Sequence, residues 1–407
     1  MFKRQAGGGN RLKALVVTNI RFRLPEKRSL WNYFEDLMLP LSEYPIDIDA
    51  FISGQKELSL QRKNIRVTDL GMHLPGIVDD MNLGYLFKTL RLKDKIDEMK
   101  PSLIHHFYLA THGMNSFDVL AAVKKTNAYP IIIGPAEVSH VLEYDDYRFY
   151  ARRKTATATE YSALKLASRP LNSLLRFVFR QTLSVCEKLV VPNTYAEGVY
   201  SDYISRKKIV VIPPGIRSET FHSEVPPNDG TVLLVGSLIS RKGQETAIRA
   251  MKGVVKTIPH ARLRLVGDGP NSAQLMALVR DLDLTQNVEF CGMLSRDDFL
   301  RALTTCNVFC HTSVSEAYSH VILEAISAGR PIVCTNIPGS RDMVEEAING
   351  FMFKPGDYRT LGDRLIEILS NTDLAFKMGM ASSRHSKKYD WTVSAKKYFD
   401  LYREVGS

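Results

Sequence analysis

Residues 226–407 alternate short apolar runs with amphipathic stretches, and several of the runs end at a glycine. The runs predict strands at Thr231–Val235, which is rich in β-branched residues, and at Arg262–Val266, Val288–Phe290, Val308–Cys310 and Pro331–Cys334. The stretches between them predict helices at Gly243–Thr257, Gln274–Asp283, Asp297–Cys306 and Val321–Ala328, with Gly329 as a helix stop. Short buried strands that alternate with helices indicate a parallel sheet covered on both faces.

The first half follows the same pattern less regularly. Its strand candidates are Ala14–Val17, Ile46–Ile52, Leu103–Phe107, Ile131–Ile133, Lys188–Val191 and Ile209–Ile212, with helical stretches at Leu86–Met99 and Leu171–Cys186. The sequence therefore predicts a second α/β domain built on a parallel sheet.

A turn-rich segment, His222–Gly230, separates the two halves, and it contains Pro226-Pro227 and Asn228-Asp229-Gly230. We place a domain boundary there, which gives an N-terminal domain at 1–225 and a C-terminal domain at 226–390. The remaining residues, 391–407, form a separate closing segment, in which Trp391–Arg403 is expected to be an amphipathic helix.

Composition excludes several classes of protein. The 407 residues are 44% hydrophobic and 24% charged, which is an ordinary globular balance. No apolar run reaches the ~18 residues of a membrane span, and no apolar stretch resembling a secretion signal follows Met1–Asn10. We expect a cytoplasmic protein whose five cysteines are buried free thiols.

The net charge of +10 is uneven, because residues 1–225 hold 32 Lys and Arg against 24 Asp and Glu, or +8. An excess of this kind favours an anionic partner, such as a phosphate-bearing acceptor or the inner membrane face. The basic and aromatic stretch Arg148–Lys154 is the candidate for peripheral membrane contact. A solvated basic surface is the alternative, and no nucleic-acid module is evident.

The strongest candidate site begins at the predicted junction between a loop and a helix. Segment Ser315–Ala325 carries Glu316 and Glu324, eight residues apart. Ser319 is placed to be the N-cap, and the N–H groups at a helix start favour a bound phosphate. Ionised carboxylates accept hydrogen bonds from paired hydroxyls, so Glu316 suits sugar hydroxyls and Glu324 a ribose. Two surface glutamates on an exposed helix are the alternative interpretation.

A second motif, Val235–Gly243, reads as a strand, a turn and a helix start with two adjacent cations, Arg241 and Lys242. Cations at such a turn can hold a diphosphate leaving group as its charge develops. A basic turn exposed to water explains the same residues without function.

Together these motifs resemble the retaining glycosyltransferases of family 4, over roughly residues 185–400. The resemblance implies the GT-B architecture: two Rossmann-like domains that face each other across a cleft, with the C-terminal helix crossing back to the N-terminal domain. Further matching segments are Ile209–Ile216 with Phe221, Leu265–Pro270, Val288–Gly292, Leu323–Ala325 with Gly329-x-Pro331, and Trp391 with the final helix.

The resemblance implies metal-independent transfer, with retention of configuration, from a nucleotide-diphosphate sugar to a sugar or lipid-linked acceptor. The donor is then a co-substrate, and no cofactor or metal is expected. The implied catalytic residues are Glu316, Lys242 and Arg241. The implied donor-binding residues are Gly236, Ser237, Cys291, Met293, Tyr318, Ser319, His320, Val321 and Glu324.

The chain departs from the family pattern at two places. Ser237 stands where the family usually has an arginine, and Arg241 is expected to substitute from another position. Relatives often end a central strand in Thr-x-His, whereas Ile133 leads here to Gly134-Pro135-Ala136-Glu137. The acceptor-side histidine therefore stays unassigned.

Two other patterns are interpreted as structural. Asp47 and Asp49 alternate along a strand, so they share one face, expected to be solvent rather than a metal site. His105, His106 and His112 follow a strand end, and hydrogen-bonded structural histidines are favoured over ligands in a cleft. The alternatives to a transferase are a nucleotide-sugar epimerase and a non-catalytic sugar-nucleotide binder.

Overall fold

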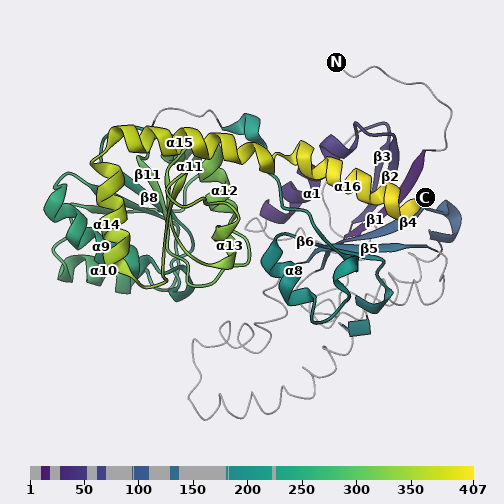
Figure 1. The fold of residues 1–407 in the computed structure, drawn as a ribbon, viewed down its shortest axis with the longest axis horizontal. Helices are drawn as coiled ribbons and strands as arrows, with labels where there is room; N and C mark the ends of the chain where they lie inside the picture. Colours follow the sequence, from purple (N-terminus) through teal and green to yellow (C-terminus); the bar gives the residue numbers. More distant parts are fainter. Residues whose placement is uncertain are drawn as a thin grey trace, which may run out of the picture. The chain divides into compact units, whose positions relative to one another are not determined.

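The computed structural model describes residues 11–18, 28–52, 62–69, 94, 96–109, 129–136, 180–181, 183–221 and 226–407. The chain divides into two units (Figure 1): unit 1 is Met1–Gly215 with Trp391–Ser407, and unit 2 is Ile216–Asp390. The first boundary between the units, after Gly215, lies before the linker that the sequence predicted at His222–Gly230. Ile216 and Phe221 are buried in the core of unit 2, and the Ile216 amide bonds the Tyr389 carbonyl at 2.8 Å.

In the described part of unit 1, seven parallel strands form one sheet in the order β3-β2-β1-β4-β5-β6-β7. The bounds are β1 Leu12–Thr18, β2 Ile46–Ile52, β3 Ile65–Asp69, β4 Leu103–Leu109, β5 Ile131–Ala136, β6 Lys188–Val191 and β7 Ile209–Val211. Of these, the sequence pattern had not indicated β3. Its central residues alternate in exposure, Arg66 lying outside between the buried Ile65 and the half-buried Val67.

Helices α1 (Arg28–Leu41) and α16 (Trp391–Gly406) pack together on this sheet. Their apolar residues, which include Phe34, Met38, Tyr398 and Tyr402, share one core with strand residues of β1 and β2. The C-terminal helix is therefore part of unit 1, as expected. Unit 1 also contains α8 (Thr194–Tyr200), capped by the Asn193 side chain, and the 3-10 turn η3 (Arg206–Lys208).

Unit 2 is a parallel α/β unit whose described residues form a six-stranded sheet in the order β10-β9-β8-β11-β12-β13. The strands are β8 Thr231–Val235, β9 Arg262–Val266, β10 Val288–Gly292, β11 Val308–His311, β12 Ile332–Thr335 and β13 Gly350–Phe353. The helices are α9 Gln244–Thr257, α10 Ser272–Asp281, α11 Arg296–Thr304, α12 His320–Ser327, α13 Pro338–Arg341, α14 Tyr358–Leu369 and α15 Thr372–Ser386. Short 3-10 turns are η4 Ser218–Thr220, η5 Ser240–Lys242 and η6 Lys387–Tyr389.

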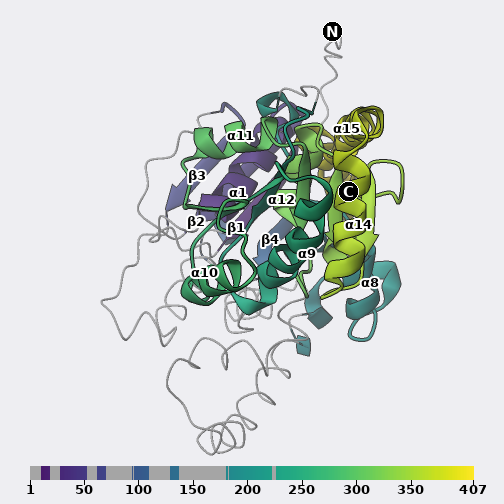
Figure 2. The same cartoon turned by 90° about the vertical axis from the view of Figure 1, so that its left-hand side faces the viewer.

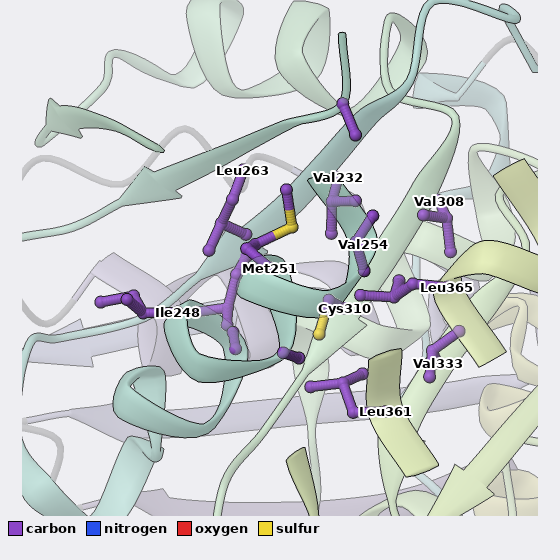
Figure 3. Close-up of a cluster of buried hydrophobic side chains, with 14 of the residues drawn as sticks. Val232, Ile248, Met251, Val254, Leu263, Val308, Cys310, Val333, Leu361 and Leu365 are labelled. Atoms are coloured by element: carbon purple, nitrogen blue, oxygen red, sulfur yellow. The ribbon is translucent and has the colours of Figure 1, made fainter. Parts of the chain in front are cut away.

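The alternation along each strand of unit 2 divides its core between the two faces of the sheet. Val232 and Leu234 of β8 join the cluster formed with α9 and α14, which lie side by side (Figures 2 and 3). Leu233 joins the opposite cluster, formed with α11 and α12. Helices thus cover both faces, as the uninterrupted apolar strands predicted.

The structure also shows the surroundings of the cysteines and of Asp47 and Asp49. All five cysteines are free, and Cys291 is half-buried while the others are buried. Asp47 and Asp49 form ion pairs with Arg11 (3.0 Å) and Arg66 (2.7 Å). Among the helices that the structure describes, none is long and apolar enough to span a bilayer. His112 and Arg148–Lys154 lie outside the described residues.

His105 and His106 are fully buried on β4. The ring of His105 bonds Tyr402 Oη at 2.5 Å and the Gly134 carbonyl at 2.9 Å, so it links the sheet to α16. Neither ring nitrogen of His106 has a hydrogen-bond partner in the structure. Burial lowers the pKa of His105 to about 3 and that of His106 to about 4. The structural interpretation therefore holds for His105, while His106 is buried without the expected hydrogen bond.

We expect His106→Leu to flatten the acid dependence of unit 1 stability. The unfolded chain binds this proton near pH 6.5 and the folded unit only near pH 4, so the free energy of unfolding falls as pH drops through that window. The contribution is at most ~1.4 kcal/mol per pH unit. Both tryptophans, Trp31 and Trp391, belong to unit 1, so their fluorescence in urea titrations at several pH values reports this unit.

The matched control is His260→Leu, which replaces an exposed histidine of unit 2 and should leave the unit 1 slope unchanged. An unaltered slope in His106→Leu would contradict the buried, uncharged state inferred for this ring.

Candidate functional site

The two sequence motifs meet at the point where the strand order of unit 2 reverses. Strand β8 lies between β9 and β11, so the chain builds the sheet outward in both directions from the β8–β11 pair. Ligands of open parallel sheets bind outside the carboxyl ends of strands at such a reversal. The basic motif follows β8 and the glutamate motif follows β11, so the fold places both motifs at this point.

Three hydrogen bonds join the loops that follow these strands. The Val314 amide donates to the Arg241 carbonyl at 2.8 Å, and the Thr312 hydroxyl donates to the Lys242 carbonyl at 2.8 Å. The Arg241 guanidinium donates to the Ser315 carbonyl at 3.1 Å. We call these contacts the loop junction. Arg241 is exposed, and its guanidinium contact with Ser315 holds the glutamate loop.

The loop junction requires a glycine at residue 243. Gly243 has a φ of +65°, and a Cβ there would lie 2.3 Å from the Thr312 carbonyl oxygen. On the other side of the turn, the buried Gln244 amide donates to the Ser237 carbonyl at 2.9 Å. Gly236 begins this turn, and Ser237 is exposed beside it.

Glu316 is held by one cation and one histidine. Its Oε1 lies 2.8 Å from Lys242 Nζ and its Oε2 lies 2.8 Å from His311 Nε2. The side chains of Lys242 and Glu316 are only 15% and 16% exposed. Burial raises the pKa of Glu316, but its contacts with His311 and Lys242 outweigh burial and lower the pKa to about 2. Glu316 is therefore an ionised acceptor at neutral pH.

Sequence reasoning missed His311, the last residue of β11. Its ring is 3% exposed, and Nε2 also lies near the hydroxyls of Ser313 (3.1 Å) and Ser319 (3.2 Å). The local signal that could have identified His311 is its position as a lone polar residue at the end of an apolar strand, just before the loop that carries Glu316.

Helix α12 begins at His320 with Ser319 as N-cap, as predicted, but the Ser319 hydroxyl makes no capping bond. The Ser319 amide donates to the Gly339 carbonyl at 3.1 Å, so it is already bonded. The next three residues, His320, Val321 and Ile322, start the helix. Amides at these positions have no carbonyl partner within the helix, which leaves them suited to a phosphate.

Glu324 lies on α12 and pairs with Arg296 at the start of α11, where Nη1 and Oε1 are 2.5 Å apart. Burial raises the pKa of Glu324, and Arg296 opposes that shift. The guanidinium of Arg296 also lies over the rings of Phe221 (5.8 Å) and Phe299 (5.3 Å). Sequence reasoning missed Arg296, because nothing local to its helix start signals a partner on α12.

The remaining predicted residues lie around this edge of the sheet. Cys291 is half-buried on β10, and Met293, which follows the left-handed Gly292, is 78% exposed. The Gly292 carbonyl accepts from the Gly267 amide at 2.8 Å, which joins the end of β10 to that of β9. Tyr318 is half-buried, and its ring meets His320 edge-on at 5.3 Å.

A known protein family matches the part of the chain that carries these loops. Residues 216–385, nearly the whole of unit 2, match the family described as glycosyl transferases group 1. The comparisons thus support a glycosyltransferase, and they place the loop junction and both glutamates inside the matched domain.

The curated relatives share low sequence identity with this chain. A sulfoquinovosyl transferase of Arabidopsis thaliana is 26% identical over 324 residues, which cover 75% of this chain and 57% of that protein. A phosphatidyl-myo-inositol mannosyltransferase of Mycobacterium leprae is 26% identical over 205 residues, or 49% of this chain and 54% of that one. The chain thus spans little more than half the length of these relatives.

Solved structures match both units. The HepE protein of Anabaena, crystallised with UDP, has a TM-score of 0.71 at 17% identity and covers 97% of this chain and 100% of its own. A sucrose-phosphate synthase of Thermosynechococcus elongatus has a TM-score of 0.72 at 17% identity, covering 97% and 99%. The chain therefore has the GT-B architecture, with two parallel-sheet α/β units.

We expect Gly243→Ala to destabilise unit 2. A left-handed backbone costs an alanine ~1–2 kcal/mol, and the clash with the Thr312 carbonyl adds to that cost. The matched control is Gly253→Ala on the exposed side of α9, where a new Cβ meets no atom within 4 Å and should stabilise the helix by ~0.5–1 kcal/mol. Calorimetric unfolding of both variants measures the difference. Equal stability of the two would contradict the loop junction.

Proposed function

We propose that this protein is a retaining, metal-independent glycosyltransferase that moves a sugar from a nucleotide-diphosphate sugar to an acceptor. The observation that carries the proposal is the half-buried Lys242–Glu316 pair at the strand-order reversal of a glycosyl transferases group 1 domain. Complexes of HepE with UDP and UDP-glucose support a nucleotide-sugar donor of this class.

Each group of the site has a role in this reaction. The carboxylate of Glu316 accepts hydroxyls of the donor sugar and so orients the sugar for transfer. Lys242 and the start of α12 neutralise the charge that develops on the departing diphosphate. The Glu324 carboxylate accepts the ribose hydroxyls. Arg241, which substitutes for the arginine that relatives have at Ser237, adds positive charge to the turn.

We expect Glu316→Ala to lower kcat by about 100-fold, because a misplaced reacting group can cost that much. Glu324→Ala should mainly weaken donor binding, by about 10-fold, through the loss of hydrogen bonds to a charged group. The measurement is initial rate against donor concentration, using a panel that includes UDP-glucose and GDP-mannose. The same assay separates a transferase from an epimerase, which would isomerise the donor, and from a binder, which would do neither.

The control for these variants is Glu367→Ala on α14, which removes an exposed Arg364–Glu367 pair of 2.7 Å and should leave kinetics unchanged. Normal rates in both Glu316→Ala and Glu324→Ala would refute the donor-site assignment. The anomeric configuration of the product, read by NMR, tests retention.

We expect activity to survive EDTA, because Lys242, Arg241 and the α12 start meet the diphosphate charge without a metal. The rate is measured before and after chelation and dialysis. Loss of activity that Mn²⁺ or Mg²⁺ restores would contradict this part of the proposal.

The acceptor is proposed to be anionic, either a phosphate-bearing sugar or a lipid at the cytoplasmic membrane face. Residues 1–225 hold +8 of the net +10, and the relatives include a D-inositol 3-phosphate glycosyltransferase and a phosphatidyl-myo-inositol mannosyltransferase. Charge attraction of this kind is screened over ~8 Å at physiological salt, so acceptor affinity should fall as salt rises.

Sedimentation with anionic and neutral vesicles, at low and high salt, tests the membrane form of this acceptor. We expect salt-sensitive binding to anionic vesicles only, with up to ~1 kcal/mol for each cation of the Arg148–Lys154 stretch. Full recovery in the supernatant throughout would exclude the lipid acceptor. An acceptor affinity independent of ionic strength would exclude the soluble anionic one as well.

A further inference from the structure

His311 is a buried polar group of the proposed donor site to which the proposed reaction gives no role. Its Nε2 lies 2.8 Å from Glu316 Oε2. An ionised carboxylate can only accept, so the imidazole donates its Nε2 hydrogen to Glu316. Nδ1 is buried and has no hydrogen-bond partner among the residues that the structure describes. Among the described residues, the polar contacts of the ring therefore all pass through Nε2, toward Glu316, Ser313 and Ser319.

The other carboxylate oxygen of Glu316, Oε1, is held by Lys242, which also has a role at the diphosphate in the proposed reaction. Oε1 contacts Lys242 Nζ at 2.8 Å, and in the proposed reaction the same ammonium neutralises the diphosphate. As charge develops on the leaving group, Lys242 is drawn toward it and its hold on Glu316 weakens. His311 sits at the end of β11, 3% exposed, and contacts no second anion among the described residues.

We propose that His311 is a positioning residue, which fixes the Glu316 carboxylate through Oε2 so that its remaining lone pairs accept the hydroxyls of the donor sugar. This inference rests on the proposed function and deepens it. His311 acts through Glu316 rather than on the reacting atoms. Its loss should therefore affect the sugar and spare the nucleoside diphosphate, whose contacts with Lys242 and α12 stay in place.

Two readouts distinguish positioning from a merely structural role. A loosened Glu316 lowers kcat much more than it raises KM, because donor binding through the diphosphate persists. The pH profile also changes. Glu316 is faced by Lys242 from the turn after β8, by His311 from β11 and by His320 from α12. Removing His311 leaves the burial of Glu316 in place, so the pKa of Glu316 rises and protonation inactivates it at higher pH.

The test compares His311→Leu, which removes the donor, with His311→Gln, whose amide can restore one. The control is His385→Leu, which removes a buried histidine 2.9 Å from Glu345, in unit 2 and outside the site. Kinetics are measured from pH 3 to 8 with UDP-glucose or GDP-mannose, whichever the wild type turns over. The dissociation constant for UDP or GDP is measured by calorimetry.

We expect His311→Leu to lower kcat by about 100-fold, to change the nucleoside-diphosphate dissociation constant less than about threefold, and to move the acidic limb of the kcat profile upward by at least about one pH unit. His311→Gln should recover at least about tenfold of the lost rate, and His385→Leu should match the wild type.

Wild-type kcat and pH profile in His311→Leu would overturn the inference, and the proposed function would stand if Glu316→Ala remained impaired. Loss of nucleotide binding in both His311 variants would also overturn it, because the histidine would then be structural. If Glu316→Ala and Glu324→Ala both kept their full rates, the donor-site assignment of the proposed function would fail. The two failures are thus distinguishable.

Discussion

The arrangement of the proposed donor site depends on the loop junction, which ties the turn after β8 to the loop after β11. Lys242 and Glu316 are 74 residues apart in the sequence. A flexible lysine and a flexible glutamate at a surface would gain little from pairing. Here the backbone carbonyls of Arg241 and Lys242 are bonded to the facing loop, so both side chains start from fixed positions and the pair is largely buried.

This arrangement gives a parallel sheet a polar site without disturbing its core. Strand β11 is apolar on both faces until its carboxyl end, where His311 is its first polar residue. The charges gather only beyond that point. Glu316 stays ionised because Lys242 and His311 oppose the effect of burial, whereas Glu324, with one exposed arginine as partner, has its pKa raised. Two glutamates of one motif thus differ in their electrostatic environment.

Much of the fold could be predicted because local patterns determine it. Thr231–Val235 and Arg262–Val266 are strands with the predicted bounds, and Trp391 begins a helix. Strand β13, Gly350–Phe353, and helices α14 and α15 went unpredicted, although the apolar run of β13 and the amphipathic pattern of α14 are local signals. The site shows the same division. The glutamates and cations were visible as motifs. His311 left only a weak local signal, and the partner of Arg296, Glu324, is 28 residues away in the sequence, which no local pattern encodes.

The membership of α16 in unit 1 has a consequence for how the chain is made. Unit 2 is one continuous segment, Ile216–Asp390, whereas unit 1 combines the segment before Ile216 with the segment after Asp390. During synthesis, unit 2 can therefore complete its fold while the protein that emerged first still lacks a helix. Until Trp391–Gly406 leaves the ribosome, the apolar face of β1, β2 and α1 has no α16 to cover it, and His105 has no Tyr402 to bond. Unit 1 thus completes its fold after unit 2, and a truncation that removes α16 destabilises unit 1.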